Sequence, residues 1–175
     1  MKAESGLPTE FITNDRKFFE RLTADIPITL AYYPGCGTDD GLERYLPNAT
    51  IVNLDHGKGQ HKLERLRTDV KVRGKIERPP FPSNTFDLAY VKDAHLSRGE
   101  LNGIVEVIKP NGLLIYSHHN CQNVGISTDR KLPELPKHDN DFWTTLDHEE
   151  LKITELDYFN EMITVFSKGR EKYNI

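Results

Sequence analysis

The fold is decided by the stretch Ile28-Thr29-Leu30-Ala31-Tyr32-Tyr33-Pro34-Gly35-Cys36-Gly37-Thr38. Its first six residues are mostly apolar, β-branched or aromatic, a composition typical of a buried strand. A glycine turn follows directly, and because Gly35 and Gly37 lack a Cβ atom, a ligand can approach the backbone there. A strand that runs into such a turn is typical of the first unit of a nucleotide-binding α/β fold.

A second apolar strand, over residues 50–55, ends in an acidic residue and is followed by His56. This residue, Asp55, comes about 20 residues after Gly35, which is the spacing expected of a carboxylate that binds the ribose of a nucleotide. A carboxylate can accept hydrogen bonds from both hydroxyl groups of a ribose. The alternative interpretation is an ordinary strand–helix turn followed by a surface aspartate.

Helical and strand patterns alternate along the rest of the chain. Residues 1–27 predict a helical lead-in, and the spacing of Ser97 and Glu100 predicts a capping box at the start of a helix. That helix is expected over 97–108 and to be closed by Lys109-Pro110-Asn111-Gly112. Further elements are expected as follows: helices over 14–24, 39–46 and 58–67, strands over 69–73, 86–91 and 113–117, a long loop over 118–146, and a terminal hairpin of 153–159 and 162–168. The alternation predicts one α/β domain over 1–175, with a mostly parallel sheet, helices on both faces and an antiparallel hairpin at its end.

Composition narrows the classes of function. The 175 residues are 37% hydrophobic and 29% charged, with a net charge of −4, which indicates a globular chain and argues against a nucleic-acid partner. A local basic strip between Arg65 and Arg78 is left open, although a solvated surface explains it as well. Neither a signal peptide nor a membrane-spanning run is present, so we expect a cytoplasmic protein without a membrane partner. The two cysteines and the adjacent His118 and His119 lack the spacing of a metal site, so no metal is expected.

Several motifs resemble those of the class I S-adenosylmethionine-dependent methyltransferases. The glycine turn resembles the first motif of that family, and residues 72–87, with Pro80-Phe81-Pro82 and Phe86-Asp87, resemble its segment before the fourth strand. His95-Leu96 is similar to the histidine–leucine pair after that strand. The stretch 106–114, with Lys109-Pro110-Asn111-Gly112, resembles the family's E-x-x-R-V-L-K-P-G-G signature. The resemblance covers residues 28–117 and implies a three-layer Rossmann-like fold with a seven-stranded sheet.

The resemblance also implies a cofactor, S-adenosylmethionine, and a set of residues to hold it. The glycine turn would lie under its methionine and ribose, Asp55 would take the ribose hydroxyls, and the remaining residues would border the adenine or the reacting methyl group. The cofactor-binding residues so implied are Tyr33, Pro34, Gly35, Cys36, Gly37, Asp55, His56, Lys75, Ile76 and Lys92. Asp93 and His95 are the candidate catalytic bases, needed only if the acceptor is a poor nucleophile. The sequence does not identify the acceptor.

Three positions depart from the family pattern. Tyr33 stands where the family has an acid near the methionine end of the cofactor, and Asp39 stands where it has a third glycine. Lys75 replaces the acid that receives the adenine amino group, and an ammonium cannot accept that hydrogen bond. Two alternatives to a methyltransferase therefore stay open: a catalytically silent binding module or partner subunit, and a nicotinamide or nucleotide-sugar Rossmann enzyme. A protein partner or a homodimer is also compatible with the sequence.

Overall fold

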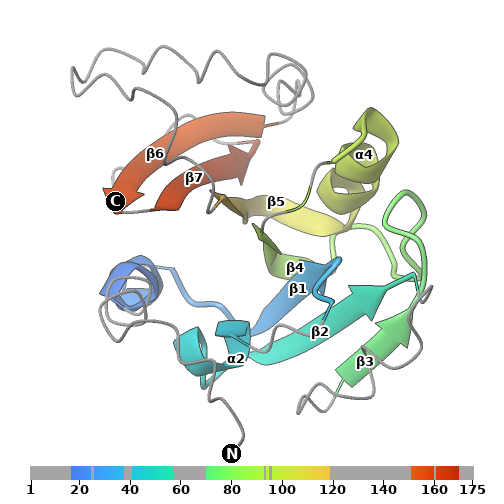
Figure 1. Ribbon diagram of the computed structural model, residues 1–175, viewed down its shortest axis with the longest axis horizontal. Helices are drawn as coiled ribbons and strands as arrows, with labels where there is room; N and C mark the ends of the chain where they lie inside the picture. Colours follow the sequence, from blue (N-terminus) through green and yellow to red (C-terminus); the bar gives the residue numbers. More distant parts are fainter. Residues whose placement is uncertain are drawn as a thin grey trace, which may run out of the picture.

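The computed structural model describes nine labelled elements and one further helix (Figure 1). The described residues are 17–24, 26–37, 41–56, 70–92, 94, 96–118, 151–159 and 161–169, and the further helix spans 17–24. The labelled elements are β1 Leu30–Pro34, α2 Gly41–Tyr45, β2 Thr50–Asp55, β3 Val70–Arg73, β4 Phe86–Lys92, α4 Arg98–Val107, β5 Ile108–His118, β6 Leu151–Phe159 and β7 Glu161–Lys168. The predicted helix over 58–67 and the predicted loop over 118–146, apart from His118, lie outside the described residues.

The strands form one seven-stranded sheet in the order β3-β2-β1-β4-β5-β7-β6. Every pair from β3 to β5 is parallel, whereas β7 runs antiparallel to both β5 and β6. The predicted Rossmann-like fold, with its mostly parallel sheet and terminal antiparallel hairpin, is confirmed. No described helix is both long enough and apolar enough to cross a membrane.

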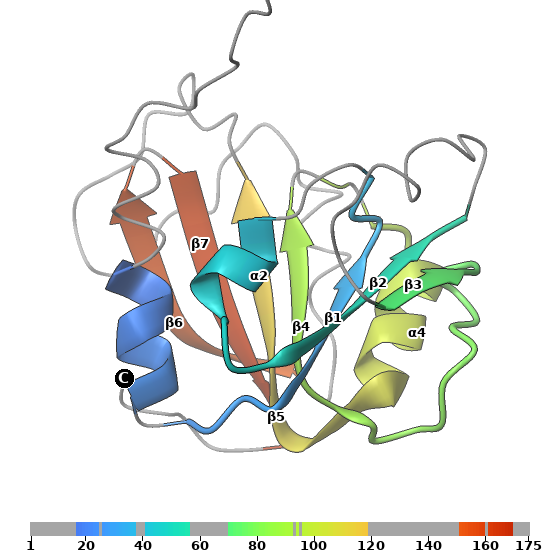
Figure 2. The ribbon, with the colours of Figure 1, turned by 90° about the horizontal axis from the view of Figure 1, so that it is seen from below.

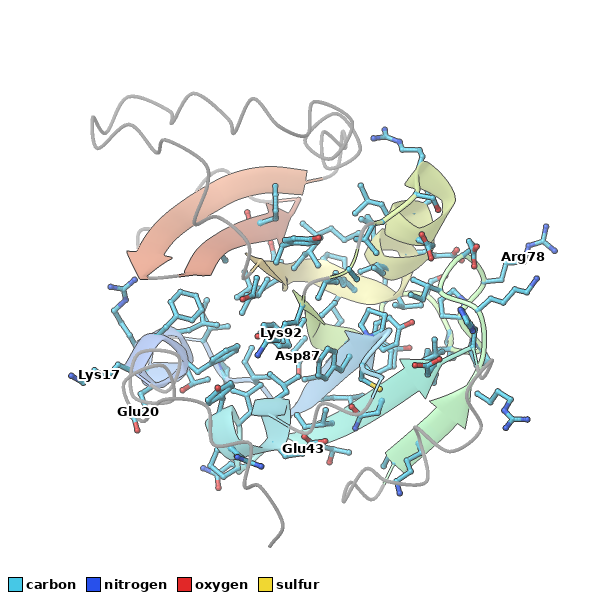
Figure 3. All side chains as sticks on the ribbon, in the orientation of Figure 1. Lys17, Glu20, Glu43, Arg78, Asp87 and Lys92 are labelled. Atoms are coloured by element: carbon cyan, nitrogen blue, oxygen red, sulfur yellow. The ribbon has the colours of Figure 1, made fainter. Side chains whose placement is uncertain are left out.

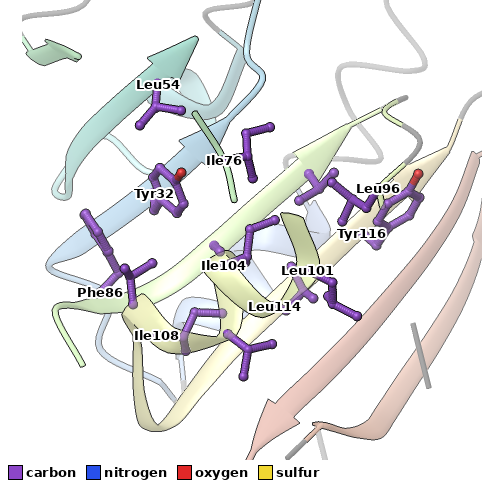
Figure 4. Packing of buried hydrophobic residues seen from close by; sticks show 14 of the residues in the cluster. Tyr32, Leu54, Ile76, Phe86, Leu96, Leu101, Ile104, Ile108, Leu114 and Tyr116 are labelled. Atoms are coloured by element: carbon purple, nitrogen blue, oxygen red, sulfur yellow. The ribbon is translucent and has the colours of Figure 1, made fainter. Parts of the chain in front are cut away.

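Two hydrophobic layers cover the two faces of the sheet, because successive side chains of a buried strand point to opposite faces. On one face, α4 packs on Tyr32, Phe86 and Leu114, as Figure 4 shows in close-up. On the other face, the helix of residues 17–24 and α2 both pack against the side chains that the strands direct to that face. Figures 1 and 2 show these helices and α4 on opposite sides of the sheet, which completes three layers.

The helix α4 begins as predicted and ends earlier than predicted. The Ser97 side chain accepts a hydrogen bond from the Glu100 N–H, and the Glu100 carboxylate accepts one from the Ser97 N–H at 2.7 Å, which confirms the capping box. The helix ends at Val107, however, because the next residue, Ile108, is extended and pairs with Phe86 in the sheet. The prediction that Lys109-Pro110-Asn111-Gly112 closes this helix is therefore wrong, since those residues belong to β5.

A glycine in α4 lets this helix approach the chain that follows β3. A Cβ atom added to Gly103 would lie 2.1 Å from the Ile76 carbonyl oxygen, far inside any allowed contact. By contrast, a Cβ atom on Gly99, in the first turn of the same helix, would have the Glu77 Cγ atom as its nearest neighbour among the described residues, at an ordinary contact distance of 3.5 Å. Gly103 therefore sets how closely Ile76 is held against α4.

Two polar groups join elements that are distant in sequence. The Asp87 carboxylate accepts hydrogen bonds from the Thr29 N–H (3.0 Å), the Thr29 hydroxyl (2.7 Å) and the Leu30 N–H (2.9 Å), and it pairs with the Lys109 ammonium at 2.7 Å. This network ties β4 to the start of β1 and to β5. The buried ammonium of Lys168 in β7 donates to the carbonyl oxygens at residues 105 and 108, at 2.8 and 2.9 Å, and so joins β7 to the end of α4.

Candidate functional site

The candidate site lies where β1, β2 and β4 end at one edge of the sheet. Parallel strands end at the same edge, and β1 is flanked by β2 on one side and β4 on the other. Connections that leave β1 and β4 pass to opposite faces of the sheet, with α2 on one and α4 on the other. Such a point is where open α/β sheets bind their ligands.

The glycine turn after β1 has the conformation that its sequence predicts. Gly35 and Gly37 have φ angles of +65° and +59°, in the left-handed region that residues with a Cβ atom rarely adopt. The Gly35 N–H donates to the Leu54 carbonyl oxygen at 2.7 Å, which ties the turn to β2. A Cβ atom on Gly37 would meet no atom of the described residues within 4 Å, so none of these residues packs against the backbone there.

Asp55 lies at the end of β2, directly after the residue that holds the turn. Its side chain is 16% exposed, and its backbone carbonyl accepts a hydrogen bond from the Gly74 N–H at 3.1 Å. His56 follows with a side chain 59% exposed and with its Nδ1 atom 3.9 Å from the Asp55 carboxylate. The structure thus brings the glycine turn, a partly accessible carboxylate and an exposed imidazole to one edge.

Tyr33 and Cys36 have buried side chains beneath this edge. The Tyr33 ring lies 5.1 Å from the Tyr90 ring, centroid to centroid, in an aromatic cluster that continues through Phe19 to Tyr45. The Cys36 thiol is also buried, with its sulfur 3.9 Å from the Leu54 carbonyl oxygen. Both side chains therefore contribute to the packing under the turn, and their role toward a cofactor stays a prediction.

Lys75 and Ile76 border the turn on the side of β3. Ile76 is buried, and its Cδ1 atom lies 3.5 Å from the position of a Cβ atom on Gly35, so it forms an apolar wall beside the turn. Lys75 is exposed, and its backbone bridges to Arg78, whose N–H donates to the Lys75 carbonyl at 3.2 Å. The ammonium of Lys75 can only donate hydrogen bonds on this side of the glycine turn, because it has no acceptor.

Lys92 and Pro34 complete the described part of the site. Lys92 is partly buried at the end of β4, in register with Ser117 of β5, and Pro34 ends β1 in register with Leu54. Figure 3 labels Lys92 and, from the other end of β4, Asp87. The candidate bases Asp93 and His95 lie outside the described residues. Within the described part of the chain, no group of three or more His, Cys, Asp or Glu side chains is placed to hold a metal ion.

One residue at this site, Tyr32, is missing from the sequence-based candidates. Its side chain is fully buried, and its hydroxyl has no hydrogen-bond partner among the described residues. Burial and the neighbouring Cys36 thiol raise the pKa of this phenol above its ordinary value. Only the position of Tyr32 in an apolar strand, directly before the turn, could have drawn attention to it, because an unpartnered hydroxyl is visible only in three dimensions.

The described residues fit an adenosyl ligand at most positions. The backbone at Gly37, the carboxylate of Asp55 and the apolar side chain of Ile76 suit a methylene chain, a ribose and the face of a base, respectively. Tyr32 adds a buried hydroxyl under the same turn. Two positions do not fit. The ammonium of Lys75 cannot accept a hydrogen bond from an adenine amino group, and the buried ring of Tyr33 offers no carboxylate to the methionine end of such a ligand.

Comparisons with known proteins match this chain by its fold only. No family model matches, and no curated protein matches by sequence. The PH0226 protein of Pyrococcus horikoshii OT3 has a TM-score of 0.64 at 13% identity, over 92% of each chain. A putative S-adenosylmethionine-dependent methyltransferase from Listeria monocytogenes has a TM-score of 0.62 at 10% identity, over 89% of this chain and 98% of the other.

A third similar structure comes from a complex. It is a complex of the Haloferax volcanii Trm112 methyltransferase activator with a putative methyltransferase, and the match has a TM-score of 0.58 at 13% identity, over 94% of this chain and 100% of the other. The chain spans about half the length of two further structures that it matches, 51% and 52%. Identities this low indicate a shared architecture and leave the chemistry to be argued from the site.

Proposed function

Because the chain has the fold of the class I S-adenosylmethionine-dependent methyltransferases, we propose that it binds this cofactor at the carboxyl edge of its sheet and transfers a methyl group. The observation that best supports the proposal is the 2.7 Å hydrogen bond from the Gly35 N–H to the Leu54 carbonyl. It holds the glycine turn next to the Asp55 carboxylate, at the point in the fold where ligands bind.

Three parts of the cofactor have a candidate partner in this chain: the ribose, the base and the chain that joins the ribose to the sulfur. The carboxylate of Asp55 accepts hydrogen bonds from the two ribose hydroxyls, and the left-handed backbone of Gly35 and Gly37 leaves room for the chain that joins ribose to sulfur. Ile76 packs against one face of the base. These assignments need no side chain from Tyr33 or Cys36, both of which are buried.

Methyl transfer asks little of the protein's side chains. When bound, the cofactor supplies a methyl group on a positively charged sulfur, already activated for attack. The protein then has to align the acceptor with the methyl group and exclude water. Lys92, at the end of β4, is proposed to line the pocket near the reacting methyl group. Asp93 and His95 are proposed to take a proton from the acceptor where the acceptor carries one.

A second candidate function is a binding module without methyl transfer. Tyr33 favours it, because this residue is locked in an aromatic cluster instead of offering a carboxylate to the methionine end of a cofactor. Lys75 favours it too, because it places an exposed ammonium where the resemblance implies an acceptor. Such a module would be expected to act through a protein partner or through a second copy of the chain.

Titration calorimetry with S-adenosylmethionine and S-adenosylhomocysteine tests the proposal. We expect binding in the micromolar range and a 10- to 100-fold loss on Asp55→Ala, because a charged acceptor of two hydroxyls contributes about 1.5–3 kcal/mol. Glu106→Gln is the matched control. Glu106 lies in the last turn of α4, at the opposite edge of the sheet, so its substitution leaves the affinity unchanged. Absence of binding at millimolar ligand contradicts the proposal and favours the binding module.

A further inference from the structure

Tyr32 carries a buried polar atom that the fold itself leaves unused. The side chain is fully buried in the core under α4, and its hydroxyl has no hydrogen-bond partner in the described part of the chain. Buried hydroxyl groups are paired in most proteins, and an unpaired one generally has a functional or solvent-mediated explanation. A second tyrosine of the same core, Tyr116, shows the ordinary arrangement, because its hydroxyl donates to the Ala94 carbonyl.

The position of the Tyr32 hydroxyl is fixed by its aromatic neighbours. The ring stacks on Phe86 with a centroid distance of 5.0 Å and an interplanar angle of 21°, and it meets the edge of Phe81 at 5.5 Å and 74°. In a close-packed interior these contacts hold the ring in one orientation. The packing of the ring therefore sets the direction in which the hydroxyl points.

This orientation places the hydroxyl under the glycine turn. Figure 4 shows it on the side of the ring that faces Leu54 and Ile76. The Leu54 carbonyl accepts the hydrogen bond of Gly35, and Ile76 contacts the same glycine. The Cys36 thiol, in the turn itself, is close enough to raise the pKa of the Tyr32 phenol. The groups around the hydroxyl are thus the groups that form the floor and wall of the candidate site.

We propose that Tyr32 is a ligand-binding residue of this site, whose hydroxyl hydrogen-bonds the base of the bound adenosyl ligand once the Ile76 side chain shifts. The inference rests on the proposed function. A phenol both donates and accepts hydrogen bonds, so it can supply the acceptor for the adenine amino group that Lys75 cannot. The Tyr32 hydroxyl then replaces the hydrogen-bond acceptor that is lost where Lys75 stands in place of an acid. Tyr32 does not belong to the family motifs.

The test compares two tyrosine-to-phenylalanine variants without relying on activity. In the ligand-free protein, Tyr32→Phe removes a hydroxyl that has no partner among the described residues, so we expect a melting temperature equal to or above that of the parent protein. Tyr116→Phe, the matched control, removes a formed hydrogen bond and lowers the melting temperature. In calorimetry with S-adenosylhomocysteine, Tyr32→Phe weakens binding about 5- to 30-fold. Tyr32→Phe weakens binding less when the ligand is an analogue of S-adenosylhomocysteine that lacks the adenine amino group.

Two results would overturn the inference while leaving the proposed function intact. One is an affinity of Tyr32→Phe equal to that of the parent protein, alongside a large loss for Asp55→Ala. The other is a melting temperature for Tyr32→Phe as low as that for Tyr116→Phe, which means that the hydroxyl already has a partner in the ligand-free protein. Failure of the parent protein to bind S-adenosylhomocysteine overturns both proposals together.

Discussion

Asp87 provides the sharpest test of how this fold is held together, because this one carboxylate of β4 accepts four hydrogen bonds from donors at the start of β1 and in β5. Burial alone raises the pKa of this carboxyl, but the hydrogen bonds from Lys109, Thr29 and Leu30 outweigh burial and lower the pKa to about 2. A folded-state pKa below the unfolded value of about 3.9 means that the ionised carboxylate stabilises the fold. That stability is present above pH 4 and is lost as the pH falls toward 2.

The size of the effect follows from the same shift. A difference of nearly two pKa units corresponds to about 2.5 kcal/mol, and partial exposure of the Asp87–Lys109 pair reduces this to about 1–2 kcal/mol. We therefore expect Asp87→Asn to lower the free energy of unfolding at pH 7 by about 1–2 kcal/mol. The amide keeps an acceptor for Thr29 and loses the charge that Lys109 requires.

Urea unfolding of the parent protein and Asp87→Asn, followed from pH 7 to pH 2.5, measures this contribution. The gap between the two free energies of unfolding should be constant down to about pH 4.5 and should close as Asp87 is protonated. Other carboxylates titrate equally in both proteins and cancel in the difference. Glu77→Gln, which removes an exposed carboxylate with no ion pair in the described part of the chain, should show no gap. A gap for Asp87→Asn that stays constant down to pH 2.5 would refute the reasoning.

Two further substitutions test the packing of α4. Gly103→Ala should lower the free energy of unfolding by about 2 kcal/mol, since the clash of its Cβ atom with the Ile76 carbonyl exceeds the gain of up to about 1 kcal/mol in helix propensity. Thermal unfolding measures the loss, and equal stability of Gly103→Ala and Gly99→Ala would contradict it. Lys168→Met leaves two buried carbonyl oxygens without their donor and should cost about 1–3 kcal/mol in urea unfolding. Lys71→Met, which replaces an exposed lysine of β3, is the control and should leave the stability unchanged. If Lys168→Met also left the stability unchanged, the Lys168 ammonium would not hold β7 to α4.

The features that the sequence predicted well depend on neighbours in the chain. The glycine turn at Gly35 follows from a backbone requirement that only glycine meets easily, and the capping box of Ser97 and Glu100 lies within one helical turn. Asp55 was placed correctly at the end of β2 because a strand pattern stops there. In each case the interacting atoms are a few residues apart, so residue types and spacing were sufficient.

The features that the sequence missed depend on contacts between distant residues. β5 begins at Ile108 because this residue pairs with Phe86, so the strand takes over residues that a local pattern assigns to a helix end. The need for glycine at Gly103 comes from the Ile76 carbonyl, in a different segment. The unpartnered hydroxyl of Tyr32 is likewise visible only once α4 and β2 enclose the ring. No local pattern carries this information.

Positions 33 and 75 both depart from the family pattern, but core packing restricts the residue at only one of them. An acid at position 33 would bury a carboxylate among the rings of Tyr90 and Phe19, at a cost of several kcal/mol unless it were paired, so packing alone accounts for an aromatic residue there. Lys75 is exposed on a turn, where packing would tolerate an acid equally well. Tyr33 therefore reports on the core of this chain, whereas packing does not determine which residue stands at position 75.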